Sequence, residues 1–82
     1  MRSEYPRIKT AAIESEHIGL DALLKWAGLA ATGGEAKLAV QEGRVRVNGS
    51  VELRRSRKLF PGDVVEYTGM TIRVTRKGQE AT

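Results

Sequence analysis

The chain has 82 residues, of which 40% are hydrophobic and 29% charged, and it carries a formal net charge of +4. This length corresponds to a single domain over residues 1–82 with a small core, because a chain of this size buries only about 60–70% of the surface that it exposes when unfolded. Cysteine is absent, which excludes disulfides and thiolate metal sites, and no stretch reaches the roughly 20 apolar residues of a membrane span, so we expect a cytoplasmic protein without a membrane partner.

The first third of the chain predicts a strand followed by a helix. Residues 1–6 are expected to form a loose tail, and residues 7–13 a short strand with Ile8 on one face. Ile18 then precedes a helix over residues 20–27, in which apolar side chains recur at i, i+3, i+4 and i+7 and form a single stripe. The stripe consists of Leu20, Leu23, Leu24 and Ala27.

A second helix is predicted over residues 35–42. Gly33-Gly34 lies at its entrance with Thr32 as a candidate N-cap, and Gly43 follows its last residue, where glycine adopts a left-handed conformation without strain. The residues expected on its buried side are small and let the helices approach closely: Ala36, Ala39 and Val40. The residues that would share its solvent side, at i, i+4 and i+7, are Lys37, Gln41 and Arg44.

Two turn signals divide the next part of the chain. Residues 45–47 alternate with the period of a strand, and Asn48-Gly49 favours a type I′ hairpin turn because both residues tolerate a positive φ. Pro61-Gly62-Asp63 predicts a second turn, in which the Asp63 carboxylate caps its own backbone.

The end of the chain predicts one more hairpin and a frayed tail. Strands over residues 64–67 and 71–75 would flank a Gly69-Met70 turn, and residues 78–82 would fray. Together these elements predict an α+β fold with two packed helices against a small, mainly antiparallel sheet. The core of this domain is expected over about residues 7–75.

The basic residues are concentrated in one part of the chain. From Lys37 to Lys58 the sequence has seven basic and two acidic residues, a net charge of +5, whereas the rest has seven basic and eight acidic residues. Basic runs are often solvated faces, but a local cationic surface on a small domain suggests a polyanionic partner, and guanidinium groups bind phosphate bidentately. No apolar pattern includes Arg54, Arg55 or Arg57, so replacing all three is expected to leave the core intact.

The GGEAK segment at residues 33–37 has two interpretations. It is a helix start if the glycines form the turn and Glu35 opposes the positive end of the helix dipole. It is a phosphate seat if the glycines let a phosphate approach the exposed N–H groups while Lys37 adds charge. The residues alone leave both interpretations open.

The sequence offers few candidate catalytic residues. His17 is the single histidine and is interpreted as a surface residue, and the serines have no plausible base partner. We therefore expect no enzyme activity, cofactor, metal or small-molecule substrate.

Lys25 follows Asp21 by four residues, which favours an intrahelical ion pair, although Lys25 would equally extend a cationic surface. Trp26 flanks the apolar stripe and is expected to pack in or partly in the core rather than stack on a base.

Several of these segments occur in an order that resembles the S-four RNA-binding domain family, named after small-subunit ribosomal protein four. They are Leu23-Leu24-Lys25, GGEAK at 33–37, GRVRVNG at 43–49, the basic run at 54–58 with Leu59, and Gly62-Asp63-Val64-Val65. The resemblance covers roughly residues 8–74 and extends to the small stand-alone bacterial members of the YaaA and YbcJ type. It implies a fold with the αL motif of that family. Ser56 departs from the family pattern, which has glycine between the arginines.

The resemblance implies a non-enzymatic RNA-binding protein with ribosomal or transfer RNA as its partner, whereas the residues themselves indicate only a polyanion. We expect a monomer that reads structured RNA through one cationic face. Such a face would read shape and phosphate spacing, because the deep, narrow major groove of A-form RNA excludes side chains. The candidate RNA-binding residues are Lys25, Lys37, Gln41, Arg44, Arg46, Asn48, Arg54, Arg55, Arg57 and Lys58.

Three alternatives remain at this point. A protein-interaction adapter would use the same basic face to meet an acidic partner. A ubiquitin-like (β-grasp) sulfur carrier shares the Val-Asn-Gly hairpin but needs a C-terminal Gly-Gly, and this sequence ends with Gln79-Glu80-Ala81-Thr82, so it is disfavoured. DNA binding stays open because phosphate contacts alone do not distinguish the two nucleic acids.

Overall fold

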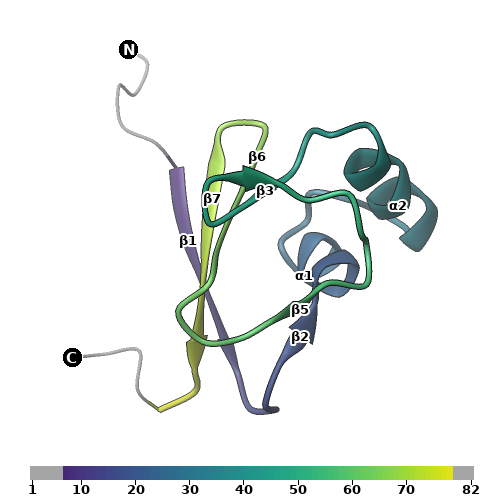
Figure 1. Cartoon of the computed structure of the whole chain (residues 1–82). Helices are drawn as coiled ribbons and strands as arrows, with labels where there is room; N and C mark the ends of the chain where they lie inside the picture. Colours follow the sequence, from purple (N-terminus) through teal and green to yellow (C-terminus); the bar gives the residue numbers. More distant parts are fainter. Residues whose placement is uncertain (1–6, 79–82) are drawn as a thin grey trace.

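The structure is a computed structural model that describes residues 7–78 (Figure 1). Its elements are β1 (Arg7–Ile13), β2 (Ile18–Gly19), α1 (Leu20–Trp26), α2 (Gly33–Gln41), β3 (Arg46–Val47), β4 (Ser50–Val51), β5 (Lys58–Leu59), β6 (Val64–Tyr67) and β7 (Met70–Arg76). The tail predicted at residues 1–6 and most of the frayed end lie outside the described residues. None of the helices described is long and apolar enough to cross a membrane.

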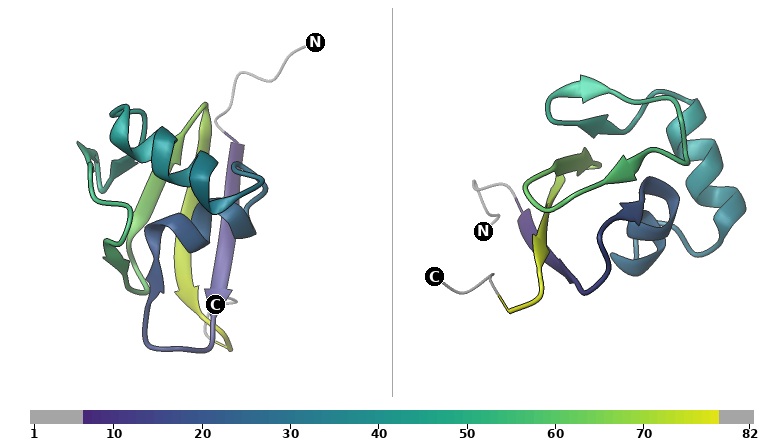
Figure 2. Two further views of the ribbon diagram at one scale, coloured as in Figure 1. Left: turned by 90° about the vertical axis from the view of Figure 1, so that its right-hand side faces the viewer. Right: turned by 60° about the horizontal axis from the view of Figure 1, so that its bottom comes forward.

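Five strands form the main sheet, in the order β1-β7-β6-β3-β4. The pairs within β7-β6-β3-β4 are antiparallel, whereas β1 runs parallel to β7. Both helices lie on the same side of this sheet (Figure 2). A separate two-stranded sheet joins β2 to β5 at the start of α1 (Figure 1). The predicted fold class, two packed helices on a mainly antiparallel sheet, is confirmed.

The core lies between the helices and the sheet. The α1 stripe is buried as predicted, with Leu20, Leu23 and Leu24 fully inaccessible. On α2 the small residues Ala36, Ala39 and Val40 are buried, also as predicted. The strands and the segments beside them contribute Val45, Val47, Leu59, Val65, Ile72 and Val74. Their burial fixes which side of each strand faces the helices.

Strand β1 has the predicted bounds, and its inward side chains are Ala11 and Ile13. Ile8 lies at an alternate position and is 67% exposed. Because successive residues of a strand point to opposite faces, the position of Ile8 follows directly from the burial of Ala11.

Both hairpin turns use two residues with positive φ, as a type I′ turn requires. Asn48 and Gly49, with φ of 52° and 88°, confirm the first prediction. The second turn was predicted at Gly69-Met70, which is wrong by one residue: its centre is Thr68-Gly69, with φ of 49° and 80°. Met70 already belongs to β7 and pairs with Tyr67. A β-branched residue at positive φ is uncommon, so Thr68 gave no turn signal.

Three side chains on the helical side differ from their expected environment. Trp26 is 51% exposed, so its predicted packing in the core is wrong; it lies just before Ala27, outside the buried stripe, with the Lys9 ammonium 5.2 Å from its ring centroid. Among the described residues Lys25 and Asp21 form no ion pair, and Asp21 instead accepts a hydrogen bond from the Ala22 N–H at 2.8 Å. His17, predicted at the surface, is half-buried, and its ring centroid lies 5.7 Å from that of Phe60.

Candidate nucleic-acid interface

The arginine-rich loop, residues 52–57, is held to the start of α1 by its backbone. Helix α1 has no side-chain cap at Gly19. Its first two N–H groups, those of Leu20 and Asp21, instead donate to the carbonyls of Arg57 at 2.9 Å and Arg55 at 3.0 Å. Helix N-termini leave such donors unsatisfied unless another group accepts from them. The loop therefore caps α1, and in return α1 fixes the path of the loop.

Glu52 is the buried acid around which the loop closes. It is 8% exposed, and it is the only polar or charged residue classed as buried in the described part of the chain. Its carboxylate accepts a hydrogen bond from Arg57 Nη1 at 2.6 Å, and others from Arg54 Nε at 3.2 Å and the Arg54 backbone N–H at 3.0 Å. The Arg57 hydrogen bond and the Arg54 N–H lower the pKa of Glu52 from 4.5 to about 2, against the opposing effect of burial.

This arrangement corrects the expectation that the three arginines can be replaced without affecting the core. Arg57 is partly buried, with 33% of its side chain exposed, and Arg54 shares the same carboxylate. Removing either partner would leave a buried charge less compensated, which destabilises a fold. Only Arg55 among the three forms no ion pair within residues 7–78.

A shallow hollow of about 340 Å³ opens on the outer side of the loop. The residues that line it are Arg54, Ser56, Arg57 and Lys58. It therefore contains three cations, one hydroxyl and no carboxylate, because Glu52, which pairs with two of the cations, does not line it. Such a surface can accept an anion with several oxygen atoms.

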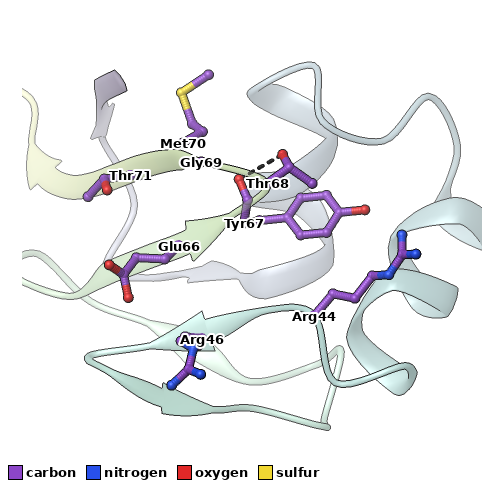
Figure 3. A pocket seen from close by; sticks show the side chains of 8 residues that line it. All are labelled: Arg44, Arg46, Glu66, Tyr67, Thr68, Gly69, Met70 and Thr71. Carbon is purple, nitrogen blue, oxygen red and sulfur yellow. Dashed lines mark hydrogen bonds between the residues drawn. The ribbon is translucent and has the colours of Figure 1, made fainter. Parts of the chain in front are cut away.

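A second groove, of about 330 Å³, lies between the start of β3 and the β6–β7 hairpin (Figure 3). Arg44 and Arg46 line it together with Glu66, Tyr67, Thr68, Gly69, Met70 and Thr71. The Tyr67 ring points toward Arg44 in this view (Figure 3). Arg46 Nη1 donates to the Gly49 carbonyl at 3.3 Å. Sequence reasoning missed Tyr67, which gave no signal beyond being an aromatic residue at the end of a strand.

Helix α2 begins with two side-chain caps. Thr32 Oγ1 accepts from the Glu35 N–H at 3.1 Å, as in the first half of a capping box, while Glu35 Oε1 accepts at 2.8 Å from the N–H of Ala31, the residue before the N-cap. The N-cap prediction is confirmed. Because the Glu35 carboxylate folds back over the helix entrance, the geometry favours the helix-start interpretation of GGEAK over a phosphate seat.

Arg44 leaves the line of Lys37 and Gln41 after the helix ends. Gly43 adopts the predicted left-handed conformation with φ of 76°, and the Arg44 N–H then donates to the Ala39 carbonyl at 3.3 Å. The Arg44 side chain pairs with Glu42 at 3.3 Å. Arg44 therefore joins Arg46 at the second groove, whereas Lys37 and Gln41 stay exposed on α2.

Asn48 holds two turns together. Its Oδ1 accepts from the Val64 N–H at 2.9 Å, and its Nδ2 donates to Asp63 Oδ1 at 3.1 Å. Asp63 Oδ2 accepts from the Phe60 N–H at 2.8 Å, so the predicted carboxylate cap of this turn is confirmed. The amide of Asn48 is thus occupied inside the protein, which favours its structural role over a contact with RNA.

The structure brings the candidate residues together in two places. Arg54, Arg57 and Lys58 meet at the hollow of the loop, and Arg44 and Arg46 meet at the second groove. Arg55 is exposed beside the first place. The candidates on the outer sides of the helices, which line neither the hollow nor the groove, are Lys25, Lys37 and Gln41.

Comparison with known proteins gives consistent matches. Residues 11–75 match the model of the S4 domain. YbcJ of Escherichia coli strain K12 is 40% identical over 58 residues, which are 71% of this chain and 83% of YbcJ. A Bacillus subtilis strain 168 protein named "Probable ribosome maturation protein RlbA" is 45% identical over 58 residues, 71% of this chain and 82% of that protein.

The solution structure of E. coli YbcJ has the same fold. It aligns with a TM-score of 0.62 and 32% sequence identity, over 92% of this chain and 94% of YbcJ. That structure is described as revealing an alfaL motif involved in RNA-binding.

Proposed function

This chain belongs to the S4 domain family, and from that premise we propose that it is a non-enzymatic, monomeric protein that binds structured RNA through its cationic surface. We define this surface as the hollow of the arginine-rich loop, Arg55, and the groove of Arg44 and Arg46. Ribosomal RNA is the first candidate and transfer RNA the second, because one relative is named for ribosome maturation. A cytoplasmic location is part of the proposal, since structured RNA of both kinds is found there.

The observation that carries this proposal is the fixed geometry of the loop. Two of its arginines and the adjacent Lys58 line one hollow without any carboxylate, and the backbone of the loop is hydrogen-bonded to α1. Guanidinium groups that are already positioned lose less conformational entropy when they bind phosphate. A solvated basic run would need none of these constraints.

The groove supports a contact that phosphate charge alone does not explain. Tyr67 is half-buried beside Arg44 and presents its ring to the groove. Unpaired bases in RNA loops and bulges stack on aromatic rings and on guanidinium planes. A structured RNA with a bulge or loop next to a helical segment would fill both the hollow and the groove.

The test is the affinity of the folded protein for ribosomal and transfer RNA over a series of salt concentrations. Arg55→Ala removes an exposed cation without an ion pair, so affinity should fall and the slope of log affinity against log salt should become shallower by about 0.7, the value for one phosphate contact with single strands. Arg73→Ala, on an exposed position of β7, removes the same charge elsewhere and should change neither. Equal effects of the two variants would show that only net charge matters.

Two further measurements distinguish the alternatives. Duplex DNA of matched length should bind more weakly than RNA if the shape of A-form RNA is recognised. Crosslinking in cells followed by sequencing would identify the RNA. Co-purification with one protein that survives nuclease treatment would instead favour the adapter function.

A further inference from the structure

The burial of Glu52 calls for a physical reason. An isolated carboxylate is costly to bury, and even a well-paired buried ion pair often contributes no more stability than packed apolar residues of similar volume. Glu52 is 8% exposed and pairs with two arginines from its own loop. What such a pair does supply is a fixed orientation of its partners.

The geometry leaves most of both guanidinium groups available. A guanidinium has five N–H donors in a rigid fork. Arg57 uses Nη1 and Arg54 uses Nε toward Glu52, and within the described residues their other side-chain donors make no hydrogen bond. Both side chains line the hollow that also contains Ser56 and Lys58. Glu52 therefore engages one donor of each fork and leaves the others free, in two side chains that both line the hollow.

We propose that Glu52 is a positioning residue, which orients Arg54 and Arg57 so that the hollow they form with Ser56 and Lys58 binds one phosphate of the RNA backbone. This inference rests on the proposed function. In it the Ser56 hydroxyl donates a hydrogen bond to a phosphate oxygen, and Lys58 contributes charge. The phosphate is held by up to four side chains, of which two are already fixed before it arrives.

The decisive variant is Glu52→Gln, which keeps the size of the side chain and removes its negative charge. If only net charge mattered, this variant would bind RNA more tightly than the parent. Positioning predicts the opposite, because a neutral amide accepts through one oxygen and turns its NH₂ group toward the other guanidinium. We expect affinity to fall by about threefold to tenfold, the range expected for the loss of one net hydrogen bond.

Two companion variants make the test specific. Glu14→Gln removes the same charge at an exposed residue that pairs with Lys77, and its affinity should stay equal to that of the parent or rise. Ser56→Ala removes the hydroxyl at an exposed position without touching Glu52, and its affinity should also fall. If Glu52→Gln does not fold, Ser56→Ala still tests whether the hollow binds a phosphate. A thermal melt and an amide NMR spectrum accompany each measurement.

Inorganic phosphate provides a probe that does not depend on RNA. Titrating phosphate into the parent should shift the Nε–Hε signals of Arg54 and Arg57, and Glu52→Gln should weaken the shift. A folded Glu52→Gln variant that binds RNA as well as the parent would overturn the positioning role and leave the proposed function intact. If the parent binds no RNA, the proposed function fails. The phosphate titration then tests the phosphate site in the hollow independently, and unshifted arginine signals would overturn that site.

Discussion

The carboxylate of Glu52 accepts hydrogen bonds from the guanidinium groups of Arg54 and Arg57, in a loop that also caps α1. The three cations of this loop and the adjacent Lys58 therefore have different roles. Arg54 and Arg57 act in the fold as well as on the surface, whereas Arg55 and Lys58 extend into solvent. A substitution at one of the first two positions changes stability and surface charge together.

The low pKa of Glu52 predicts a specific acid sensitivity. Its folded pKa, about 2, lies below the ordinary 4.5, because Arg57 and the Arg54 N–H stabilise the carboxylate. A group with a depressed pKa contributes stability above its unfolded pKa, and that contribution is lost as pH falls toward the folded value. Urea unfolding of the parent and of Glu52→Gln should therefore converge as pH falls from 4.5 toward about 2. A stability difference that is constant over this window would contradict the assignment.

At the scale of single residues the sequence located the cations but not their partners. The basic run and the two acids between Lys37 and Lys58 were visible, yet nothing in the linear order showed that Glu52 would be buried beneath the run. Trp26 is the opposite case, an apolar residue expected in the core that the fold leaves exposed. It flanks an apolar stripe, yet in the fold it stays half exposed, with the Lys9 ammonium over its ring.

The elements whose signals are local agree with their predictions. The stripe of α1, the cap at Thr32 and the turn at Asn48-Gly49 each depend on residues no more than seven positions apart in the sequence. The two-residue pair of β2 with β5 gave no signal, because two residues are too few for a visible alternation. It forms when the arginine-rich loop returns to α1, and Ile18 then pairs with Leu59.

The packing of α1 on α2 and the sheet predicts that the buried side chains of α1 are needed for stability. Leu24 is fully buried, and truncating a buried leucine to alanine costs about 2–5 kcal/mol. Against the roughly 5–15 kcal/mol of a whole domain, Leu24→Ala should lower the melting temperature strongly or prevent folding. Leu38→Ala is the matched control, because Leu38 lies on α2 but is 56% exposed. Equal melting temperatures for the two variants would show that the helix packing is misassigned.

For the whole molecule, the fold converts one cationic stretch of sequence into two separate places. The left-handed Gly43 turns Arg44 away from Lys37 and toward the β6–β7 hairpin, while the loop returns to the start of α1 with its own hollow. The net charge of the stretch predicted a polyanionic partner. Its division between a hollow and a groove depends on strand pairing over long sequence separations, which composition and spacing do not encode.

This division makes the combined effect of loop substitutions predictable. Replacing Arg54, Arg55 and Arg57 by alanine removes both partners of Glu52, so the melting temperature should fall, contrary to the expectation from sequence. The double variant Arg55→Ala/Lys58→Ala removes two exposed cations and leaves the Glu52 cluster intact. Its melting temperature should match the parent, while its salt slope should become shallower by at least about 0.7, the value for the phosphate contact of Arg55, because Lys58 shares its phosphate with Arg54 and Arg57.

In the double variant the affinity for RNA therefore falls while stability is kept, whereas in the triple variant both fall together. Both properties are measured on the same samples, with RNA titrations well below the melting temperature of the triple variant. If the triple variant melts like the parent, the Glu52 cluster does not stabilise the fold. If the double variant melts like the parent and binds RNA with an unchanged slope, the exposed side of the loop makes no phosphate contact, and the RNA surface must lie at the groove of Arg44 and Arg46.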